Sequence, residues 1–449
     1  MASSSSAQSR WLPFRLRPAA CGRGLLRRVR QRPWAAALVA GGLLLVAGLG
    51  YYVIAPQVHG YRHWSRAQQA LQRHELDEAQ AHLEKCLTVW PDNAEVHFAL
   101  ARTYRRSGDL SAARRHLQRA DQLGWPTEAT DLEYLLLRAQ SGELNAVRPV
   151  LVPLLQARHP EEVAILETLA QVALDRHLID EAVRWATVWT ERYPEDWRPR
   201  FVRGLALEAY VLAAADEKAI KDYERVLELK PDHAEARYKL GDLLRRTGQY
   251  KAALSHLEAC YRQNPEDSRV VVSLARCLLY LRQASAAKAL LDEWLAKHPE
   301  GEADVFLVRG QADYDLGEPE KALPWLRRAE QLAAKDEDTF RSLANTLRRL
   351  GQHDEAARYD RLAKDFHKQI ERLRTLLRDI RANPDAVAPR YEAGIILLRT
   401  GHEREGVRWL HSVLDIDPRH AATHQTLADY YEKVNDLERA RVHRAAAGP

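Results

Sequence analysis

Residues 234–265 read AEARYKLGDLLRRTGQYKAALSHLEACYRQNP, and this stretch decides the fold. It contains two amphipathic helical patterns joined by a short turn. Leu240 lies on the apolar face of the first pattern, Gly248 marks the turn, and Ala253 lies on the apolar face of the second. Pro265 ends the second helix, because proline lacks the backbone N–H and clashes with the preceding turn. The stretch therefore predicts a helix–turn–helix unit.

The same unit recurs along the chain, and its spacing can be followed by the small residue on the second helix. That residue is found at Ala79, Ala113, Ala146, Ala182, Ala219, Ala253, Ala287, Ala322, Ala356, Gly406 and Ala440. The successive steps are 34, 33, 36, 37, 34, 34, 35, 34, 50 and 34 residues. This regular spacing predicts an array of about eleven helical pairs.

A helix–turn–helix period of 34 residues with this order of residue types resembles the tetratricopeptide repeat family. The family's small position on the first helix is met at Ala101, Ala170, Gly241, Ala275, Gly310, Ala344, Gly394 and Ala428. The resemblance covers about residues 60–449 and implies an all-α fold, a right-handed α-solenoid whose paired helices approach closely. Trp189 and Trp294 fall at core positions of second helices, so we expect them to pack rather than to stack on a ligand.

The one irregular step, 50 residues in place of 34, surrounds residues 369–386. Ile370 and Ile380 belong to a helical apolar stripe there, so we expect a lengthened connecting helix rather than a loop. This helix would divide the body into a solenoid of about nine units, residues 60–368, and a C-terminal repeat pair, residues 387–449.

Basic charge is concentrated at the N-terminus. Residues 1–33 contain eight arginines and no acidic residue. Removing these eight from the 67 basic residues leaves 59 against 62 acidic ones, so the rest of the chain carries a net charge of −3. The body therefore lacks the net positive field expected of a nucleic-acid-binding protein.

Residues 34–55 read WAAALVAGGLLLVAGLGYYVIA and contain no charged residue. A helix of this length would be about 33 Å long at about 1.5 Å per residue, enough to cross the hydrocarbon core of a bilayer. Trp34, Tyr51 and Tyr52 suit the two membrane interfaces. The sequence therefore predicts one transmembrane helix before the solenoid. The positive-inside rule makes residues 1–33 a basic cytoplasmic tail and places the repeats on the other side.

The N-terminal sequence allows two other interpretations. A cleaved signal peptide has a shorter apolar stretch of about 7–15 residues. The small-x-small site ending at Ala55 is also followed by Pro56, which disfavours cleavage. A mitochondrial presequence would be rich in Ser and Arg and free of acidic residues, as residues 1–32 are. We expect a single-pass protein of a bacterial-type inner membrane, with a mitochondrial membrane as the alternative.

Catalytic motifs are absent from the sequence: there is no phosphate-binding loop, nucleophile elbow, zinc-protease motif or dinucleotide fingerprint. The pairs His82/Cys86 and His256/Cys260 each share a helix face, but no further ligands stand at close spacing. We therefore expect no enzyme, no metal site and no cofactor. Cys260 and Cys277 come from consecutive helices and are either disulfide-bonded or two buried thiols.

A concave surface lined by the first helices is the expected binding site. The resemblance implies that four positions of each first helix face it. In this sequence they are occupied by Arg102, Arg105, Arg106, Tyr238, Arg245, Arg246, Arg276, Arg341, Asn345, Arg348 and Arg349. Guanidinium groups hold carboxylates bidentately, so such a row would suit an acidic ligand. Alternatively, arginines near a helix C-terminus only complement the helix dipole.

These features predict a membrane-anchored, non-catalytic scaffold or adaptor that holds protein or peptide partners in a concave groove. We expect no nucleic-acid partner and no small-molecule substrate. The alternative is a substrate-recruiting or assembly subunit of a membrane or envelope enzyme or secretion complex, with catalysis supplied by another chain.

Overall fold

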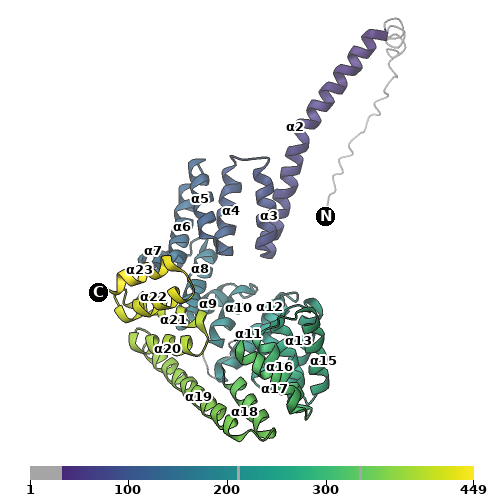
Figure 1. Ribbon diagram of the computed structural model, residues 1–449. Helices are drawn as coiled ribbons and strands as arrows, with labels where there is room; N and C mark the ends of the chain where they lie inside the picture. The colour runs from purple at the N-terminus through teal and green to yellow at the C-terminus, as the bar shows by residue number, and fades with distance from the viewer. Residues whose placement is uncertain (1–32, 210–212, 333–335, 449) are drawn as a thin grey trace, which may run out of the picture. The chain divides into compact units, whose positions relative to one another are not determined.

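The computed structural model describes residues 33–209, 213–332 and 336–448, and over these residues it contains helices and no strand (Figure 1). The chain divides into two compact units, Met1–Leu137 and Arg138–Pro449. The all-helical fold and the repeated pairing of neighbouring helices confirm a solenoid of the predicted type. Its right-handed sense stays a prediction.

The helices alternate between the first and second members of successive pairs. In the first unit they are α2 (Pro33–Arg73), α3 (Leu76–Leu87), α4 (Ala94–Ser107), α5 (Leu110–Gln122) and α6 (Thr127–Arg138). The second unit begins with a π-helical turn, Ala139–Glu143, and continues with α7 (Leu144–Gln156), α8 (Glu162–Asp175), α9 (Ile179–Arg192), α10 (Arg198–Glu208), α11 (Ala213–Leu229), α12 (Ala234–Arg246), α13 (Tyr250–Gln263), α14 (Ser268–Tyr280) and α15 (Ala284–Lys297). It ends with α16 (Ala303–Asp315), α17 (Pro319–Gln331), α18 (Glu337–Arg349), α19 (His353–Ala382), α20 (Val387–Arg399), α21 (Glu403–Ile416), α22 (Ala421–Lys433) and α23 (Leu437–Ala447).

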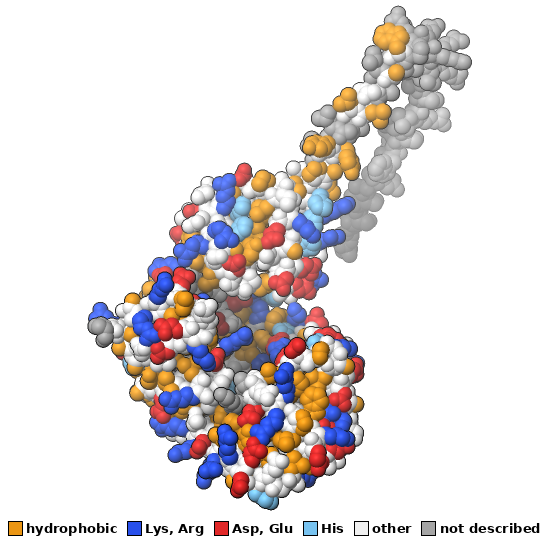
Figure 2. Space-filling model, viewed as in Figure 1, with side chains coloured by type: hydrophobic (Ala, Val, Ile, Leu, Met, Phe, Trp, Pro, Cys, Tyr) orange, Lys and Arg blue, Asp and Glu red, His pale blue; other side chains and the backbone are white. Residues whose placement is uncertain are grey.

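Helix α2 joins the predicted membrane segment and the first helix of the repeat array without a break. Large apolar side chains are exposed along it, among them Leu44, Tyr52 and Ile54, and Figure 2 shows hydrophobic side chains along its N-terminal part. Among the residues that the structure describes, none of the helices has an apolar stretch long enough to cross a bilayer. Several side chains of residues 34–55 lie outside the described residues, as does the tail up to residue 32, so the anchor stays a prediction.

In ten helical pairs whose inner turn lies within the described residues, that turn contains one residue in the left-handed region of backbone conformation. These residues are His74, Gly108, Gly142, His177, Gly248, Arg282, Gly317, Gly351, Gly401 and Asn435, with φ between 53° and 116°. A left-handed residue just after a helix allows the chain to reverse while the last carbonyls of the helix stay hydrogen-bonded. Glycine adopts this conformation without steric cost, whereas the four other residues are strained there.

The buried residue on the second helix follows this turn residue by five positions. Nine of the eleven predicted small residues stand at this position and are buried: eight alanines, which are 0–2% exposed, and Gly406. A tenth, Ala219, is also fully buried. The exception is Ala146, which is exposed, while Val147 is 1% exposed and stands five positions after Gly142. The prediction at Ala146 was therefore wrong by one residue.

The small residues on the first helices are all buried, as predicted. Their reason is visible at Gly310, where an added Cβ would lie 2.7 Å from side-chain carbons of Leu326 and 3.2 Å from the carbonyl oxygen of Ala322. The paired helices α16 and α17 thus approach too closely for a larger residue. Gly394 stands in the same relation to Leu410 in the C-terminal repeats.

The residues inserted in the irregular step belong to α19, a single helix of 30 residues that begins at His353. The insertion thus lengthens the second helix of a pair, with Leu376 and Ile380 buried on it. The predicted division of the body into a solenoid, residues 60–368, and a C-terminal repeat pair, residues 387–449, stays a prediction. Trp189 is fully buried and Trp294 is 5% exposed, so both pack in the core, as expected.

Candidate binding groove

A hollow of about 390 Å³ lies along α12, α14, α16 and α18, the first helices of four consecutive pairs. It is lined by Arg245, Arg276, Leu279, Tyr280, Arg282, Gln311, Tyr314, Asp315, Asp338, Ser342 and Asn345. Three residues of the predicted set, Arg245, Arg276 and Asn345, are therefore brought together at one site. The lining contains three guanidinium groups and two carboxylates, so its charge is mixed rather than strongly positive.

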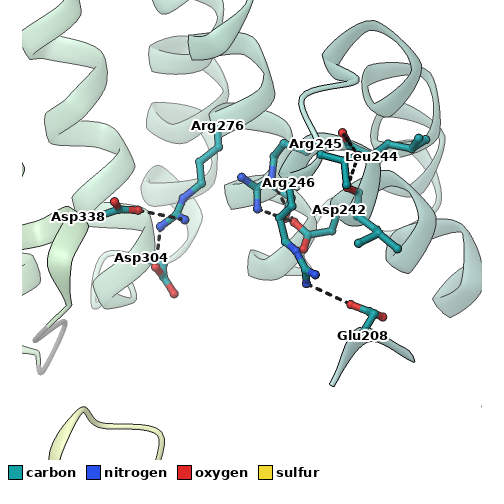
Figure 3. A network of polar contacts seen from close by, with 11 residues as sticks. Glu208, Asp242, Leu244, Arg245, Arg246, Arg276, Asp304 and Asp338 are labelled. Carbon is teal, nitrogen blue, oxygen red and sulfur yellow. Dashed lines mark hydrogen bonds and ion pairs between the residues drawn. The ribbon is translucent and has the colours of Figure 1, made fainter. Parts of the chain in front are cut away.

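Arg276 lies between two carboxylates from the next two first helices (Figure 3). Its Nη2 atom is 3.1 Å from Oδ1 of Asp304, and its Nη1 atom is 3.9 Å from Oδ2 of Asp338. The side chains of the two aspartates are 61% and 64% exposed. Ion pairs at such exposure contribute little free energy, so an incoming carboxylate can replace either partner at small cost.

Arg245 and Arg246 are held by carboxylates of this chain (Figure 3). Arg245 donates to Asp242 at 2.9 Å, and Arg246 donates to Glu208 of α10 at 3.1 Å. Burial acts to raise the pKa of Asp242, but the charge of Arg245 and its hydrogen bonds lower that pKa overall. Asp242 is therefore a stable anion that neutralises Arg245 at the edge of the hollow.

The remaining candidates of the second unit also have partners within the chain. Arg341 is ion-paired with Glu337, Arg348 donates to Asp360 at 2.6 Å, and Arg349 donates to the carbonyl oxygen of Tyr314 at 3.1 Å. Asn345 accepts from Arg348 at 2.8 Å, and Tyr238 lies beneath the guanidinium of Arg269, 5.0 Å from ring centroid to Cζ. Most of the predicted row is thus neutralised locally.

Two of the three candidates of the first unit lie next to a buried carboxylate. Arg105 is 1% exposed and is ion-paired with Glu133 of α6, itself 3% exposed. Arg102 has its Nε atom 4.0 Å from the same carboxylate, and Arg106 donates to His74 at 3.3 Å. Arg105 therefore belongs to the core and does not line an open groove. Whether any of the predicted residues binds a partner stays a prediction.

Several lining residues were not predicted from the sequence. Tyr280 is 59% exposed and stacks on Tyr250 with 4.6 Å between ring centroids. The guanidinium of Arg349 lies over the ring of Tyr314, with Cζ 4.1 Å from the ring centroid. Arg282 occupies the left-handed turn position and faces Asp315. Burial raises the pKa of Asp315, against the lowering effect of Arg282 and Arg349. One sequence signal could have pointed to this part of the site: Arg282 stands at a turn position that glycine occupies in most repeats.

In the pair His82/Cys86, both side chains contact other residues of the chain. Cys86 donates to the carbonyl oxygen of Gly60 at 3.6 Å, and His82 contacts His63 with 2.9 Å between Nδ1 atoms. Cys260 and Cys277 are buried free thiols, and burial raises the pKa of Cys260 to about 11, which keeps that thiol protonated. Within the described residues, no cluster of ligating side chains could hold a metal ion.

Four tetratricopeptide repeat profiles match this chain, at residues 70–124, 217–268, 244–311, 303–328 and 338–370. The matched stretches together cover less than half of the 449 residues. They support the tetratricopeptide repeat family for these parts of the chain and agree with the helical pairs in the structure. Repeats of this class are typically non-catalytic scaffolds that present concave surfaces to protein partners.

The relatives found by sequence share only short parts with this chain. Tetratricopeptide repeat protein 21B of Mus musculus is 27% identical over 135 residues, 28% of this chain and 10% of the relative. DnaJ homolog subfamily C member 3 of Gallus gallus is 28% identical over 160 residues, 32% of this chain and 31% of the relative. The chain thus spans less than a third of the length of these relatives. A tetratricopeptide repeat protein from Parabacteroides merdae covers 64% of this chain with 99% of its own, at 17% identity and a TM-score of 0.33.

Proposed function

We propose that this protein is a non-catalytic scaffold that binds a segment of a partner protein in the hollow along α12, α14, α16 and α18. The observation that carries the proposal is the lining itself, which combines guanidinium groups with the exposed ring of Tyr280. Arginine and tyrosine are among the side chains enriched at binding hot spots. The weakly held Arg276 favours a partner segment that offers a carboxylate next to an apolar or aromatic side chain.

A peptide-display selection tests this proposal with a defined probe. We expect random peptides selected on the purified protein to be enriched in acidic and aromatic residues. Ser342→Trp places a large ring in the hollow and should lower the affinity of the selected peptides by at least about tenfold, which corresponds to about 1.4 kcal/mol. The matched control is Ser255→Trp, an exposed position on the second helix α13.

The control should bind the selected peptides as the unchanged protein does. If both tryptophan variants bind equally well, the binding site lies outside the hollow. If no peptide is enriched over background in repeated selections, the proposed groove function is wrong.

We further propose that residues 34–55 anchor the protein in a membrane and that the repeats lie on the side opposite the basic tail. The support is the uncharged sequence of 22 residues and the exposure of Tyr51 and Tyr52, which are 77% and 80% exposed. Because α2 continues into the first repeat, such an anchor would hold the array close to the bilayer and raise the effective concentration of membrane partners.

A reporter enzyme that is active only in the cytoplasm, fused after Pro449, tests the orientation. We expect no reporter activity and recovery of the protein in the alkali-resistant membrane fraction. Deletion of residues 34–55 should release the protein from that fraction. Reporter activity would refute the outward orientation, and release of the full chain by alkali would refute the anchor itself.

A further inference from the structure

The turn between α8 and α9 contacts α20 and α21, which follow it by more than 200 residues within the same unit (Figure 1). Arg176 at this turn is ion-paired with Asp415 of α21. The backbone carbonyl of His177 accepts from Nη1 of Arg390 at 3.4 Å, and the imidazole of His177 stacks on Trp409 with 4.8 Å between ring centroids. We call these five residues the latch.

Three of the five latch residues are buried. Arg390 is 2% exposed, Trp409 3% and His177 6%. Arg390 also donates to the carbonyl oxygen of Pro384 at 2.8 Å and to Oγ of Ser412 at 3.2 Å, so its guanidinium is held by neutral acceptors. A buried cation without a directly bonded carboxylate depends on these acceptors, and one of them is supplied by the α8–α9 turn.

His177 is not required by the local structure of its turn. Its φ is 53°, the left-handed conformation that glycine adopts at most of the other turns. A non-glycine residue is strained in this conformation, so an imidazole here makes the isolated turn less favourable. What the imidazole adds is its contact with Trp409, which no glycine could make.

We infer that the latch closes the helices from α8 to α21 into a ring, since each of these helices also packs on its neighbours along the chain. The closure is poised to open. Nδ1 and Nε2 of His177 and Oδ2 of Asp415 are buried with no hydrogen-bond partner among the described residues. A cavity of about 100 Å³ also remains at the contact, lined in part by Ile179, Leu377 and Trp409. Unsatisfied polar atoms and unfilled space both weaken an interface.

A distance measurement between spin labels tests the latch without any partner. The labels are introduced through keto amino acids at Glu191 on α9 and Arg404 on α21, two exposed positions outside the latch. We expect one narrow distance distribution for the unchanged protein. The double variant Arg176→Ala, His177→Gly should shift the distribution to longer and broader distances, because it removes the ion pair and the stacked ring while giving the turn its least strained residue.

The matched control is Asn435→Gly, which makes the same backbone change at an exposed turn outside the latch, where φ is 62°. It should leave the distribution unchanged. If the double variant loses helical content by circular dichroism, Asp415→Ala serves as the second test and should broaden the distribution from the other side of the contact. A narrow distribution retained in both latch variants, or a broad one in the unchanged protein, would overturn the inference.

Discussion

Glu133→Ala should lower the local free energy of unfolding of the first unit by about 3–5 kcal/mol, the cost of breaking a buried ion pair from one side. Glu133 is 3% exposed and is ion-paired with Arg105, which is 1% exposed. The variant leaves the guanidinium of Arg105 in the core with its carboxylate removed. Hydrogen exchange of the amides of α4 and α6 measures the loss, because it reports local opening without requiring that the whole chain unfold in one step.

Two controls separate the buried charge from other effects. Asp92→Ala removes a carboxylate that is ion-paired with Arg119 on the surface of the same unit, with a side chain 67% exposed. It should cost no more than about 1 kcal/mol. The double variant Arg105→Met, Glu133→Leu should recover most of the stability, because it replaces both charges with apolar groups of similar volume. Equal losses for Glu133→Ala and Asp92→Ala would show that the pair is not buried in solution.

The ion pair between Arg105 and Glu133 could not be predicted from the repeat pattern. The repeat period correctly located the helical pairs, the close approaches at residues such as Gly310, and the core position of Trp189. These features depend on contacts within one pair of helices, which recur with the period. Arg105 has the same spacing as the groove positions of other repeats, but it is ion-paired with Glu133 of the next first helix, and both side chains are buried.

Three residues of the predicted set, Arg245, Arg276 and Asn345, line the hollow, but the charge of the hollow could not be predicted from the sequence. The arginines could be counted from the sequence, but the carboxylates that neutralise them come from neighbouring units, as Asp304 does for Arg276. The latch could not be predicted at all, since Arg390 and His177 are separated by 213 positions and no periodicity relates them. The difference at Ala146 has a local cause: the turn at Gly142 sets the register, so the buried position is Val147 and not the small residue before it.

Trp189→Ala should lower the local free energy of unfolding around α9 by about 3–5 kcal/mol, as for other fully buried tryptophans. Trp189 is 0% exposed, and the guanidinium of Arg198 on α10 lies 5.0 Å from its ring centroid. Truncation leaves a cavity between α9 and α10 that the flanking helices fill only in part. Hydrogen exchange of α8, α9 and α10 measures the loss. Trp185→Ala, at a half-buried position of the same helix, should cost less.

The pattern of exchange matters as much as its size. In an array whose units contact only their neighbours, a defect opens the adjacent helices and leaves distant ones protected. We therefore expect α14 and α15, three pairs further along, to keep their protection in Trp189→Ala. Helix α21 is more distant in sequence but is joined to the α8–α9 turn through Arg176 and Asp415. Faster exchange in α21 with unchanged exchange in α14 would show that the defect passes through the latch, whereas uniform loss would contradict nearest-neighbour coupling.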